Sequence, residues 1–268
     1  SLLVGHSTTG TLSDAVRNVG VGNTSLDSIT SGDDNTAIGY GSGTAITTGQ
    51  QNAALGNNAL YTLSTGTFNT GAGYQAGRNA TGNRNTFLGE NAGRHLSSGS
   101  GNVIIGGGDL GTTGNTGSRQ LQIMGYDGST RTTWIDGDSS GNLTFKRVDT
   151  GDDSPYVLTL QTGETDIAAD DVIGSINFQA PDEGAGTDAI LVAAGIEAVS
   201  EGDFSSSNNA TKLSFKTAAS AAAAETMSLS SVGVLTVSGA ITSSGIVTGT
   251  AFTAGSAVLA EAELELLD

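Results

Sequence analysis

The sequence contains no cysteine, which excludes a disulfide framework, thiol chemistry and a thiolate metal site. Proline is almost absent, with 2 residues, while aromatic residues make up 5% and charged residues 14% of the chain. Because both fractions are low for a globular domain, a single compact core would be short of large side chains. We therefore expect an elongated, oligomeric protein that buries small residues at many short contacts.

Basic residues and long apolar runs are also scarce. The chain has 10 Lys and Arg against 27 Asp and Glu, and its formal net charge is −17. Most of the imbalance lies in residues 118–268, which hold 21 acids and 6 bases. An acidic surface argues against nucleic acid and anionic membranes as partners. No apolar run is long enough to cross a bilayer, so we expect no membrane insertion.

Glycine, by contrast, is abundant, and much of it belongs to a repeat in the first 117 residues. Typical copies read "RNVGVGNTSLDSITSG", "DNTAIGYGSGTAITTG" and "QNAALGNNALYTLSTG". In every copy an Asn is followed three residues later by an aliphatic or alanine residue, and then by glycine. Successive Asn residues are 17 residues apart, with one spacing of 16. The Asn residues are Asn18, Asn35, Asn52, Asn69, Asn85 and Asn102, and the glycines are Gly22, Gly39, Gly56, Gly73, Gly89 and Gly106.

A fixed period of this length predicts a β-solenoid over residues 1–117, in which each repeat forms one coil. Seventeen residues are too few for two helices but suit two or three short strands with tight turns. Thr36 and Ile38 alternate with Ala37 and Gly39, as in a strand. We expect glycine to supply positive φ at corners, and stacked Asn side chains to form a ladder. A flexible Gly/Ser-rich linker is the alternative, but nothing physical would keep a linker in register.

Ordinary strand patterning follows the repeat, and residues 118–235 are predicted to form one or two small all-β modules. The expected strands lie in two hairpins over 119–148 and then in the segments 156–163, 171–181, 189–200, 211–218 and 226–239. Residues 218–226 suggest a helical turn or a packed linker. Residues 236–268 are predicted to form a slender β shaft. A short helix over 256–268 would place Leu259, Leu264 and Leu267 on one side.

Candidate catalytic groups are few, and we expect neither an enzyme nor a cofactor. The two histidines fall in turn regions of the repeat, where they read as exposed, variable positions. The paired carboxylates that a polysaccharide-cleaving enzyme needs are flanked by small or turn-forming residues, as solvated turns are. These candidates are His6, His95, Asp33/Asp34, Asp152/Asp153, Asp170/Asp171 and Asp182/Glu183.

One segment, "DGDSSGN" over 136–142, imitates the start of a calcium loop. Asp136, Asp138 and Ser140 occupy alternate positions, but Arg147 stands where the bidentate Glu belongs. A plain hairpin turn is the favoured reading, and a calcium site is the alternative. Nearby, Trp134 and Tyr126 suggest contact with a sugar face, although core packing or a trimer seam is the preferred interpretation.

The motifs also resemble known families. "AIGYGS", "ALGNNA" and "FLGENA" are similar to head repeats of trimeric autotransporter adhesins, which form β-rolls in a three-chain bundle on a shorter period. The longer form "NTAIGYGSG…TTG" resembles repeats in tail fibres and related receptor-binding appendages of bacteriophages. "TWIDGDSSGNLTF" and "ETMSLSSVGVLTVSGAI" resemble segments of fibre proteins. The sequence departs from the adhesins in its period, and it shows no membrane-anchor barrel and no self-cleaving chaperone domain.

Together these features predict an elongated all-β homotrimer with a solenoid, small β-modules and a shaft. The resemblance implies a structural, adhesive fibre of a phage virion that contacts other virion proteins and a glycan or protein receptor on the host surface. A bacterial surface adhesin or an extracellular filament subunit is the alternative. Because the chain opens within a copy of the repeat, we expect the natural protein to begin upstream.

Overall fold

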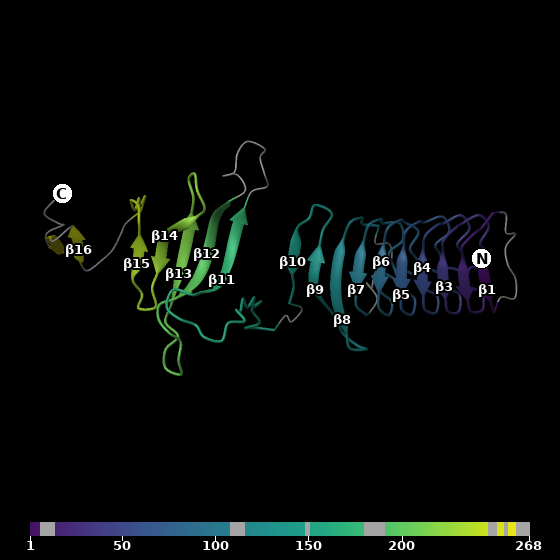
Figure 1. The fold of residues 1–268 in the computed structure, drawn as a ribbon, viewed down its shortest axis with the longest axis horizontal. Coiled ribbons are helices and arrows are strands. Elements are labelled where there is room, and N and C mark those ends of the chain that lie inside the picture. Colours follow the sequence, from purple (N-terminus) through teal and green to yellow (C-terminus); the bar gives the residue numbers. More distant parts are fainter. Residues whose placement is uncertain are drawn as a thin grey trace. The chain divides into compact units, whose positions relative to one another are not determined.

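The computed structural model describes residues 1–5, 14–107, 116–147, 151–179, 191–245, 251–254 and 257–260. These residues form strands, turns and bends without any helix, so the predicted all-β class is confirmed. The chain divides into two compact units, Ser1–Val157 and Leu158–Asp268 (Figure 1). The boundary expected at residue 117 falls inside the first unit, because strands on both sides of it belong to one sheet.

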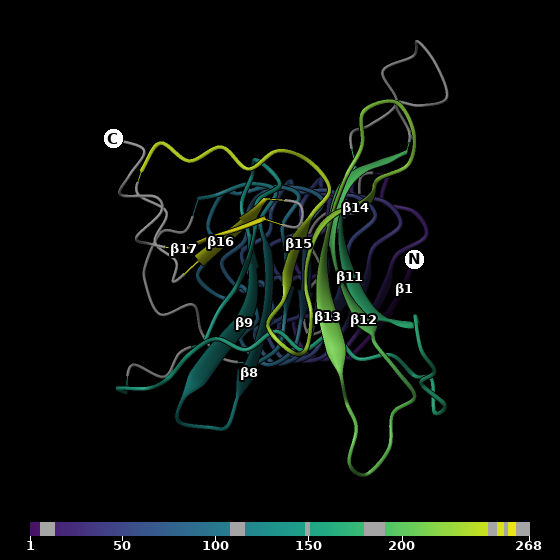
Figure 2. The same cartoon turned by 90° about the vertical axis from the view of Figure 1, so that its left-hand side faces the viewer.

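The first unit begins with a stack of three-residue strands, one from each coil. Neighbouring strands pair in parallel with corresponding residues aligned, as Thr36 with Ala53 and Ile38 with Leu55. The predicted β-solenoid is therefore confirmed, and its coils follow one another along the stack (Figures 1 and 2). The strands are β1 (Leu2–Val4), β2 (Val19–Val21), β3 (Thr36–Ile38), β4 (Ala53–Leu55), β5 (Thr70–Ala72), β6 (Thr86–Leu88) and β7 (Val103–Ile105).

Outside these strands, the described residues of each coil form turns, bends and irregular backbone, so the expected second or third strand per coil is wrong there. Left-handed backbone recurs six and eight residues after each of the first five ladder asparagines, as at Thr24 (φ 56°) and Leu26 (φ 53°), and this interrupts extended structure. The turns are still bonded between coils. The amide of Leu26 donates to the carbonyl of Ser42 (3.1 Å), and that of Leu60 donates to Ala76 (3.0 Å).

The single 16-residue spacing leaves the sheet undisturbed, since Thr70 still lies opposite Thr86. The preceding coils carry an exposed turn residue, Thr48 or Thr65, directly before their closing glycine. In the shorter coil Thr81 is the counterpart of Thr47, since the amide of Thr81 donates to the carbonyl of Ser97 (2.8 Å) as that of Thr47 donates to Ser64 (2.9 Å), and Gly82 follows it directly. The missing residue thus belongs to an exposed turn, where its loss changes no buried contact.

The solenoid core combines large and small side chains from successive coils. Alanines such as Ala37 and Ala54 occupy the inward position of the strands, and Phe87 occupies it in β6. Glycines flank this ring: a Cβ on Gly77 or Gly93 would collide with Phe87. The core therefore admits the ring of Phe87 because glycine stands at these points in its own coil and in the preceding one.

Three further strands, of which the first two are longer, complete a ten-stranded sheet: β8 (Leu121–Tyr126), β9 (Arg131–Gly137) and β10 (Leu143–Phe145). β8 pairs in parallel with β7, whereas β9 and β10 are antiparallel additions. These are the strands predicted over 119–148. The β8–β9 hairpin extends past the outline of the coils (Figures 1 and 2).

The second unit contains an antiparallel meander of five strands. The segments predicted after residue 170 are found as β11 (Val172–Gln179), β12 (Val192–Ser200), β13 (Thr211–Thr217), β14 (Ala224–Leu229) and β15 (Leu235–Val237). The strand predicted over 156–163 is wrong. Instead of pairing as a strand, this segment places Leu160 beside β11, where a Cβ on Gly174 would be 3.1 Å from the Cβ of Leu160.

No helix forms where the sequence suggested one within the described residues. Residues 218–223 connect β13 to β14, and the amides of Ala218 and Ala223 donate to carbonyls of Ala193 (3.0 Å) and Val192 (2.9 Å). β16 (Ala251–Ala254) and β17 (Ala257–Ala260) form a hairpin. The helix expected over 256–268 is thus wrong at 257–260, because pairing overrides the helix propensity of Ala and Leu. Leu264 and Leu267 lie outside the described residues.

Candidate functional site

The six asparagines form a continuous hydrogen-bonded ladder inside the solenoid. Each is at most 2% exposed. Asn52 is typical: its Nδ2 donates to Oδ1 of Asn35 (2.9 Å) and to the carbonyl of Gly66 (2.9 Å). Its Oδ1 accepts from the backbone amide (2.9 Å) and Nδ2 (3.1 Å) of Asn69. Every donor of this buried amide is therefore paired and its oxygen accepts twice, which makes the ladder a structural element.

The glycine columns allow the coils to approach closely. Gly39 has a φ of 133°, and a Cβ there would be 2.6 Å from the carbonyl oxygen of Gly56. The other glycines of this column that follow the strands of β2–β7 have φ between 117° and 135°. No L-residue fits this conformation and this gap together.

The strands of the solenoid present uncharged side chains to the outside, a surface that we call the outer stripe. It comprises the first and third residues of β2–β7, none of which is titratable. The inward residue is the middle one, such as Ala37, whereas the repeated aliphatic residue faces out and is 46% exposed at Ile38. The outer stripe consists of Val19, Val21, Thr36, Ile38, Ala53, Leu55, Thr70, Ala72, Thr86, Leu88, Val103 and Ile105.

The meander of the second unit also has an uncovered apolar face. Paired residues on this face include Ile176 with Ile196, and Leu213 with Leu229. Leu213, Leu229 and Phe178 are exposed, while the opposite face carries polar residues such as Lys216. A contiguous apolar surface of this kind on a single chain marks a contact with another molecule.

A β-bulge positions Trp134 on β9. Ile135 lies opposite Ile123 and Thr133 lies opposite Met124, so Trp134 is the extra residue between them. Its carbonyl accepts a hydrogen bond from the amide of Lys146 (3.0 Å). The indole lies over Gly125, where a Cβ would be 2.7 Å from its ring. Trp134 is 53% exposed, so packing in the chain's own core, one of the expected roles, is excluded.

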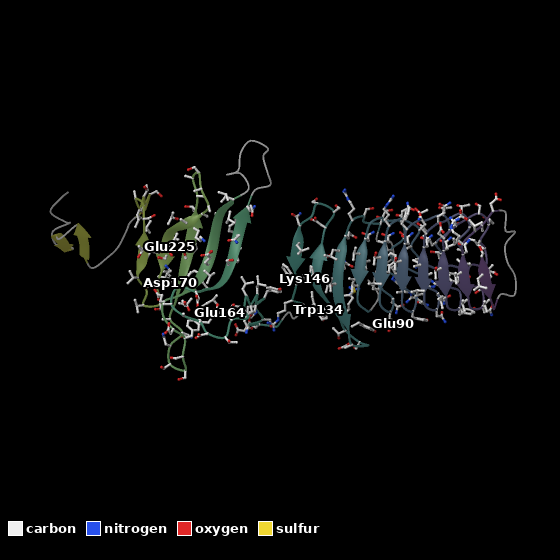
Figure 3. The ribbon with its side chains drawn as sticks, viewed as in Figure 1. Glu90, Trp134, Lys146, Glu164, Asp170 and Glu225 are labelled. Carbon is white, nitrogen blue, oxygen red and sulfur yellow. The ribbon has the colours of Figure 1, made fainter. Side chains whose placement is uncertain are left out.

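Two hollows of about 410 and 370 Å³ adjoin Trp134, and both include Thr132. The first is also lined by Lys146, Arg147 and Tyr156. Figure 3 shows Trp134 and Lys146 at the end of the first unit. The second hollow is lined by Tyr126, Asp127 and Thr130 together with Gly125.

Sequence reasoning singled out Trp134 and Tyr126 but missed the other aromatic and cationic residues of these hollows. Tyr156 reaches the hairpin because Nη1 of Arg147 donates to the carbonyl of Pro155 (2.8 Å). The ring of Tyr156 then lies 6.5 Å from that of Phe145, centroid to centroid. No motif indicates this arrangement. The unusual proximity of Lys146 and Arg147 in an acidic chain was the one available signal.

The carboxylates of the calcium-loop candidate have protein partners. Asp138 accepts hydrogen bonds from the amides of Ser140 (2.8 Å) and Asn142 (3.0 Å) and from the side chain of Asn142 (2.7 Å). The side-chain bond from Asn142 is the main cause that lowers the pKa of Asp138. Asp136 forms an ion pair with Lys146. These contacts describe a closed hairpin turn, and calcium binding stays a prediction.

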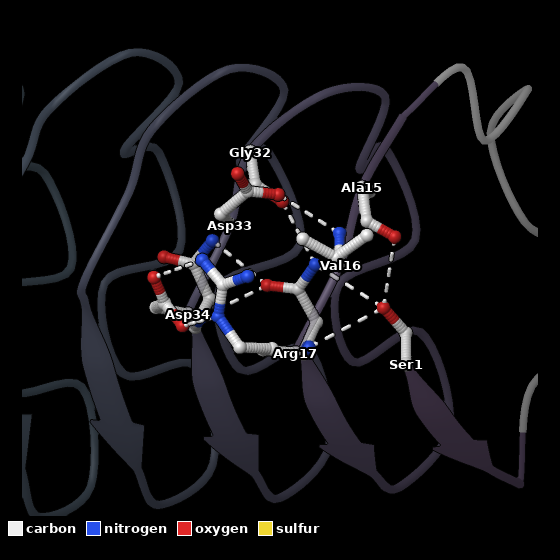
Figure 4. Close-up of polar contacts among 9 residues, drawn as sticks. Ser1, Ala15, Val16, Arg17, Gly32, Asp33 and Asp34 are labelled. Atoms are coloured by element: carbon white, nitrogen blue, oxygen red, sulfur yellow. Dashed lines mark hydrogen bonds and ion pairs between the residues drawn. The ribbon is translucent and has the colours of Figure 1, made fainter.

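The acid pair Asp33/Asp34 connects neighbouring coils (Figure 4). Oδ1 of Asp33 accepts from the amide of Val16 (2.8 Å), and Asp34 pairs with Arg17 through contacts of 2.5 and 2.8 Å. The hydrogen bond from Arg17 lowers the pKa of Asp34. This acid pair is thus engaged in contacts between coils.

The other candidates do not assemble into one site. His95 is half-buried in a turn, and His6 lies outside the described residues, as do Asp182 and Glu183. Asp152 and Asp153 are exposed. Asp171 accepts from the amide of Ala168 (2.6 Å), a local loop contact, and Asp170 adjoins it. Within the described ranges, no group of three His, Asp or Glu side chains is arranged to hold a metal ion.

Comparison with known proteins identifies no relative. No family model, no curated protein and no solved structure matches the chain. Across the part of the chain that the structure describes, no helix has the length and apolar character needed to span a membrane.

Proposed function

We propose that this chain is a structural subunit of an adhesive fibre, a homotrimer that presents receptor-binding surfaces on a phage virion. The observation that carries the proposal is the outer stripe, an uncharged, partly apolar surface that runs across successive coils of a solenoid. The resemblance of the repeats to those of tail fibres is the reason for proposing a virion.

Another copy of the same chain is the partner that best fits this surface. A chain of net charge −17 repels its own copies wherever its acids approach one another. The outer stripe contains no acid or base, so copies can approach there without like-charge contact. Removing its exposed aliphatic side chains from water contributes ~25 cal/mol per Å² of apolar surface. The apolar face of the meander provides the same kind of contact in the second unit.

The outer stripes and the meander faces both contribute area to the proposed interface between copies. At a strand spacing of ~4.8 Å and a rise of ~3.3 Å per residue, the outer stripe of six strands covers roughly 300 Å² as a flat area. Three stripes amount to about 900 Å², so the stripes alone do not reach the ~1,200 Å² at which specific, stable interfaces begin, and the meander faces have to supply the rest. Multivalent binding then follows, since three weak receptor sites on one fibre act through effective concentration.

The test is the solution mass of the full chain by light scattering, together with an unheated SDS gel. We expect a particle of roughly 80 kDa, three times the 26.6 kDa of one chain, consistent with a closed homo-oligomer. Ile38→Glu places a charge in the outer stripe and should reduce this mass while leaving the far-UV circular dichroism of the coils unchanged. Thr48→Glu adds the same charge at an exposed turn and is the matched control.

Each result has a definite meaning. A wild-type particle of 26.6 kDa would overturn the homotrimer. An Ile38→Glu protein that keeps the trimer mass would show that the outer stripe is not the interface. Long polymers in electron micrographs would favour a filament subunit instead of a discrete fibre.

A further inference from the structure

We propose that the two hollows beside Trp134 bind an acidic glycan, a chain of at least two sugar units that carries carboxylate or sulfate groups. This assignment rests on the adhesive function proposed above, for which it names the receptor chemistry. All residues of the two hollows belong to the first unit, and they lie on or beside the hairpin strands β8–β10.

The first argument is the distribution of aromatic side chains. The chain has one Trp and five Tyr, and the Trp and two of the Tyr line these hollows. Tyr156 lines one hollow, Tyr126 lines the other, and Trp134 belongs to both. Pyranose rings present faces of C–H groups, which pack on the negative face of an exposed aromatic ring. Side chains of this kind suit a glycan because they are apolar on the face and polar at the edge.

The second argument is that the backbone holds Trp134 open to solvent. The bulge adds Trp134 to β9, and bulges commonly redirect a side chain near a functional site. Gly125 provides space for the indole on β8. The hydroxyl of Tyr126 donates to the carbonyl of Gly128 (2.8 Å), which fixes a second ring at the same hairpin. The aromatic surface is therefore formed before any ligand arrives, which lowers the ordering cost of binding.

The third argument is the charge of the first hollow. Lys146 and Arg147 both line it, although the whole chain has 10 basic residues against 27 acids. The bond from Arg147 to the carbonyl of Pro155 holds the guanidinium at the hollow. Lys146 also pairs with Asp136, which offsets part of its charge, so the guanidinium of Arg147 is the main donor of charge-assisted hydrogen bonds to a carboxylate or sulfate, with Lys146 beside it.

The second hollow carries an acid instead of bases, and this difference in charge determines the orientation of the bound glycan. Asp127 accepts hydrogen bonds from the amides of Thr130 (2.6 Å) and Ser129 (2.8 Å), and these two bonds lower its pKa. An ionised Asp127 repels an acidic group and accepts from sugar hydroxyls. The acidic sugar unit therefore belongs beside Lys146 and Arg147, and a neutral unit belongs beside Asp127. Both volumes lie within the ~300–1,000 Å³ of small-molecule sites.

The single tryptophan of the chain makes the test direct, since its fluorescence reports on Trp134 alone. The full chain is titrated with oligogalacturonate, which bears carboxylates, with carrageenan oligosaccharides, which bear sulfates, and with uncharged maltohexaose. We expect a saturable change in emission with at least one acidic probe, at an affinity tenfold or more above that for maltohexaose. The two acidic probes distinguish carboxylate from sulfate. The absence of a saturable change with both, or equal affinity for all three, overturns the proposal.

Variants are measured by calorimetry and light scattering. Trp134→Ala should abolish binding of the acidic probe, and the double variant Lys146→Gln/Arg147→Gln should weaken it tenfold or more. Tyr40→Ala, at an exposed tyrosine of the solenoid, should leave binding unchanged. If Trp134→Ala lowers the mass of the particle, Trp134 belongs to the interface between copies and the glycan site is overturned. A chain that binds the probe as a monomer would overturn the homotrimer and keep the glycan site.

Discussion

Asn52 illustrates how a single buried side chain determines the repeat. Its amide donates twice and its oxygen accepts twice, and the partners come from the coils on either side and from its own coil. An aspartate lacks the two N–H donors, and an aliphatic residue lacks both the donors and the accepting oxygen. Glutamine has the same groups on a longer chain, and Gln120 stands at the end of the ladder, where its backbone amide donates to Oδ1 of Asn102 (2.9 Å).

Replacing Asn52 with Ala should lower the free energy of unfolding by about 3 kcal/mol, because donors and acceptors in two neighbouring coils lose their partners in a buried place. Denaturant unfolding followed by circular dichroism, at one fixed protein concentration, measures this loss. Asn57→Ala is the control. Asn57 is exposed, and its replacement should change the stability by no more than ~0.5 kcal/mol. Equal losses for both variants would contradict the role of the ladder.

For the coil, the sequence predicts the stacking well but does not predict the backbone conformation of the turns. The Asn spacing predicts stacked coils because each copy must align its Asn with the next. The turns after each strand were not predictable, since Leu26 and Leu60 adopt left-handed backbone that leucine rarely does. Both side chains are fully buried, and both amides bond to the next coil, so the stack enforces this local conformation.

The hollows at the hairpin could likewise be predicted from the sequence only in part. Trp134 and Tyr126 were recognisable from their position beside a predicted turn. The bulge that exposes Trp134 depends on a one-residue register shift, which no residue type signals in this sequence. Tyr156 joins the site only through the folded path of the chain, as fixed by Arg147.

In the meander, an ion pair between β13 and β14 predicts a pH dependence. Nζ of Lys212 is 2.9 Å from Oε2 of Glu225. Hydrogen bonds from Lys212, Ser214 and Ser228 lower the pKa of Glu225 to about 2. Because the folded-state pKa lies below the unfolded one, the pair stabilises the fold at neutral pH, and this contribution is lost as the pH falls from about 4.5 to about 2.

Glu225→Gln should therefore be less stable than the wild type at neutral pH, by at most ~1 kcal/mol because the pair is partly exposed to solvent. The difference should disappear at acidic pH. Urea unfolding of both proteins across this pH range measures it, and Glu164→Gln, at an exposed carboxylate, is the control. A difference that persists at the acidic end would contradict the assigned cause.

At the scale of the whole molecule, the two units combine regular backbone bonding with uncovered faces. The ladder asparagines of the solenoid bond within the chain, whereas its strands present the outer stripe, and the meander likewise leaves Phe178 and Leu229 exposed. In the homotrimer proposed above, contacts between copies would supply the burial that a compact domain obtains from its own core. This explains how a chain so poor in aromatic side chains can be stable.

The stack also predicts that a whole coil can be removed. Deleting residues 51–67 joins Gln50 to Phe68 and brings Asn69 next to Asn35 in the ladder, with every later coil in register. We expect a folded protein with a slightly lower melting temperature, because one interface between coils is lost. Deleting residues 51–59 instead removes part of a coil and should unfold the solenoid. Thermal unfolding by circular dichroism compares the two, and equal effects would contradict the modular stack.

One exposed turn accommodates the one-residue difference between coils. This affects how recombination can alter the gene. Since the turn tolerates a coil of either length, misaligned recombination between two copies of the repeat yields a product that stays in reading frame and still folds. Each event would lengthen or shorten the solenoid by ~4.8 Å, one strand spacing, without altering the hairpin that carries Trp134. Under the function proposed above, the length of the fibre and the recognition of its receptor would be inherited separately.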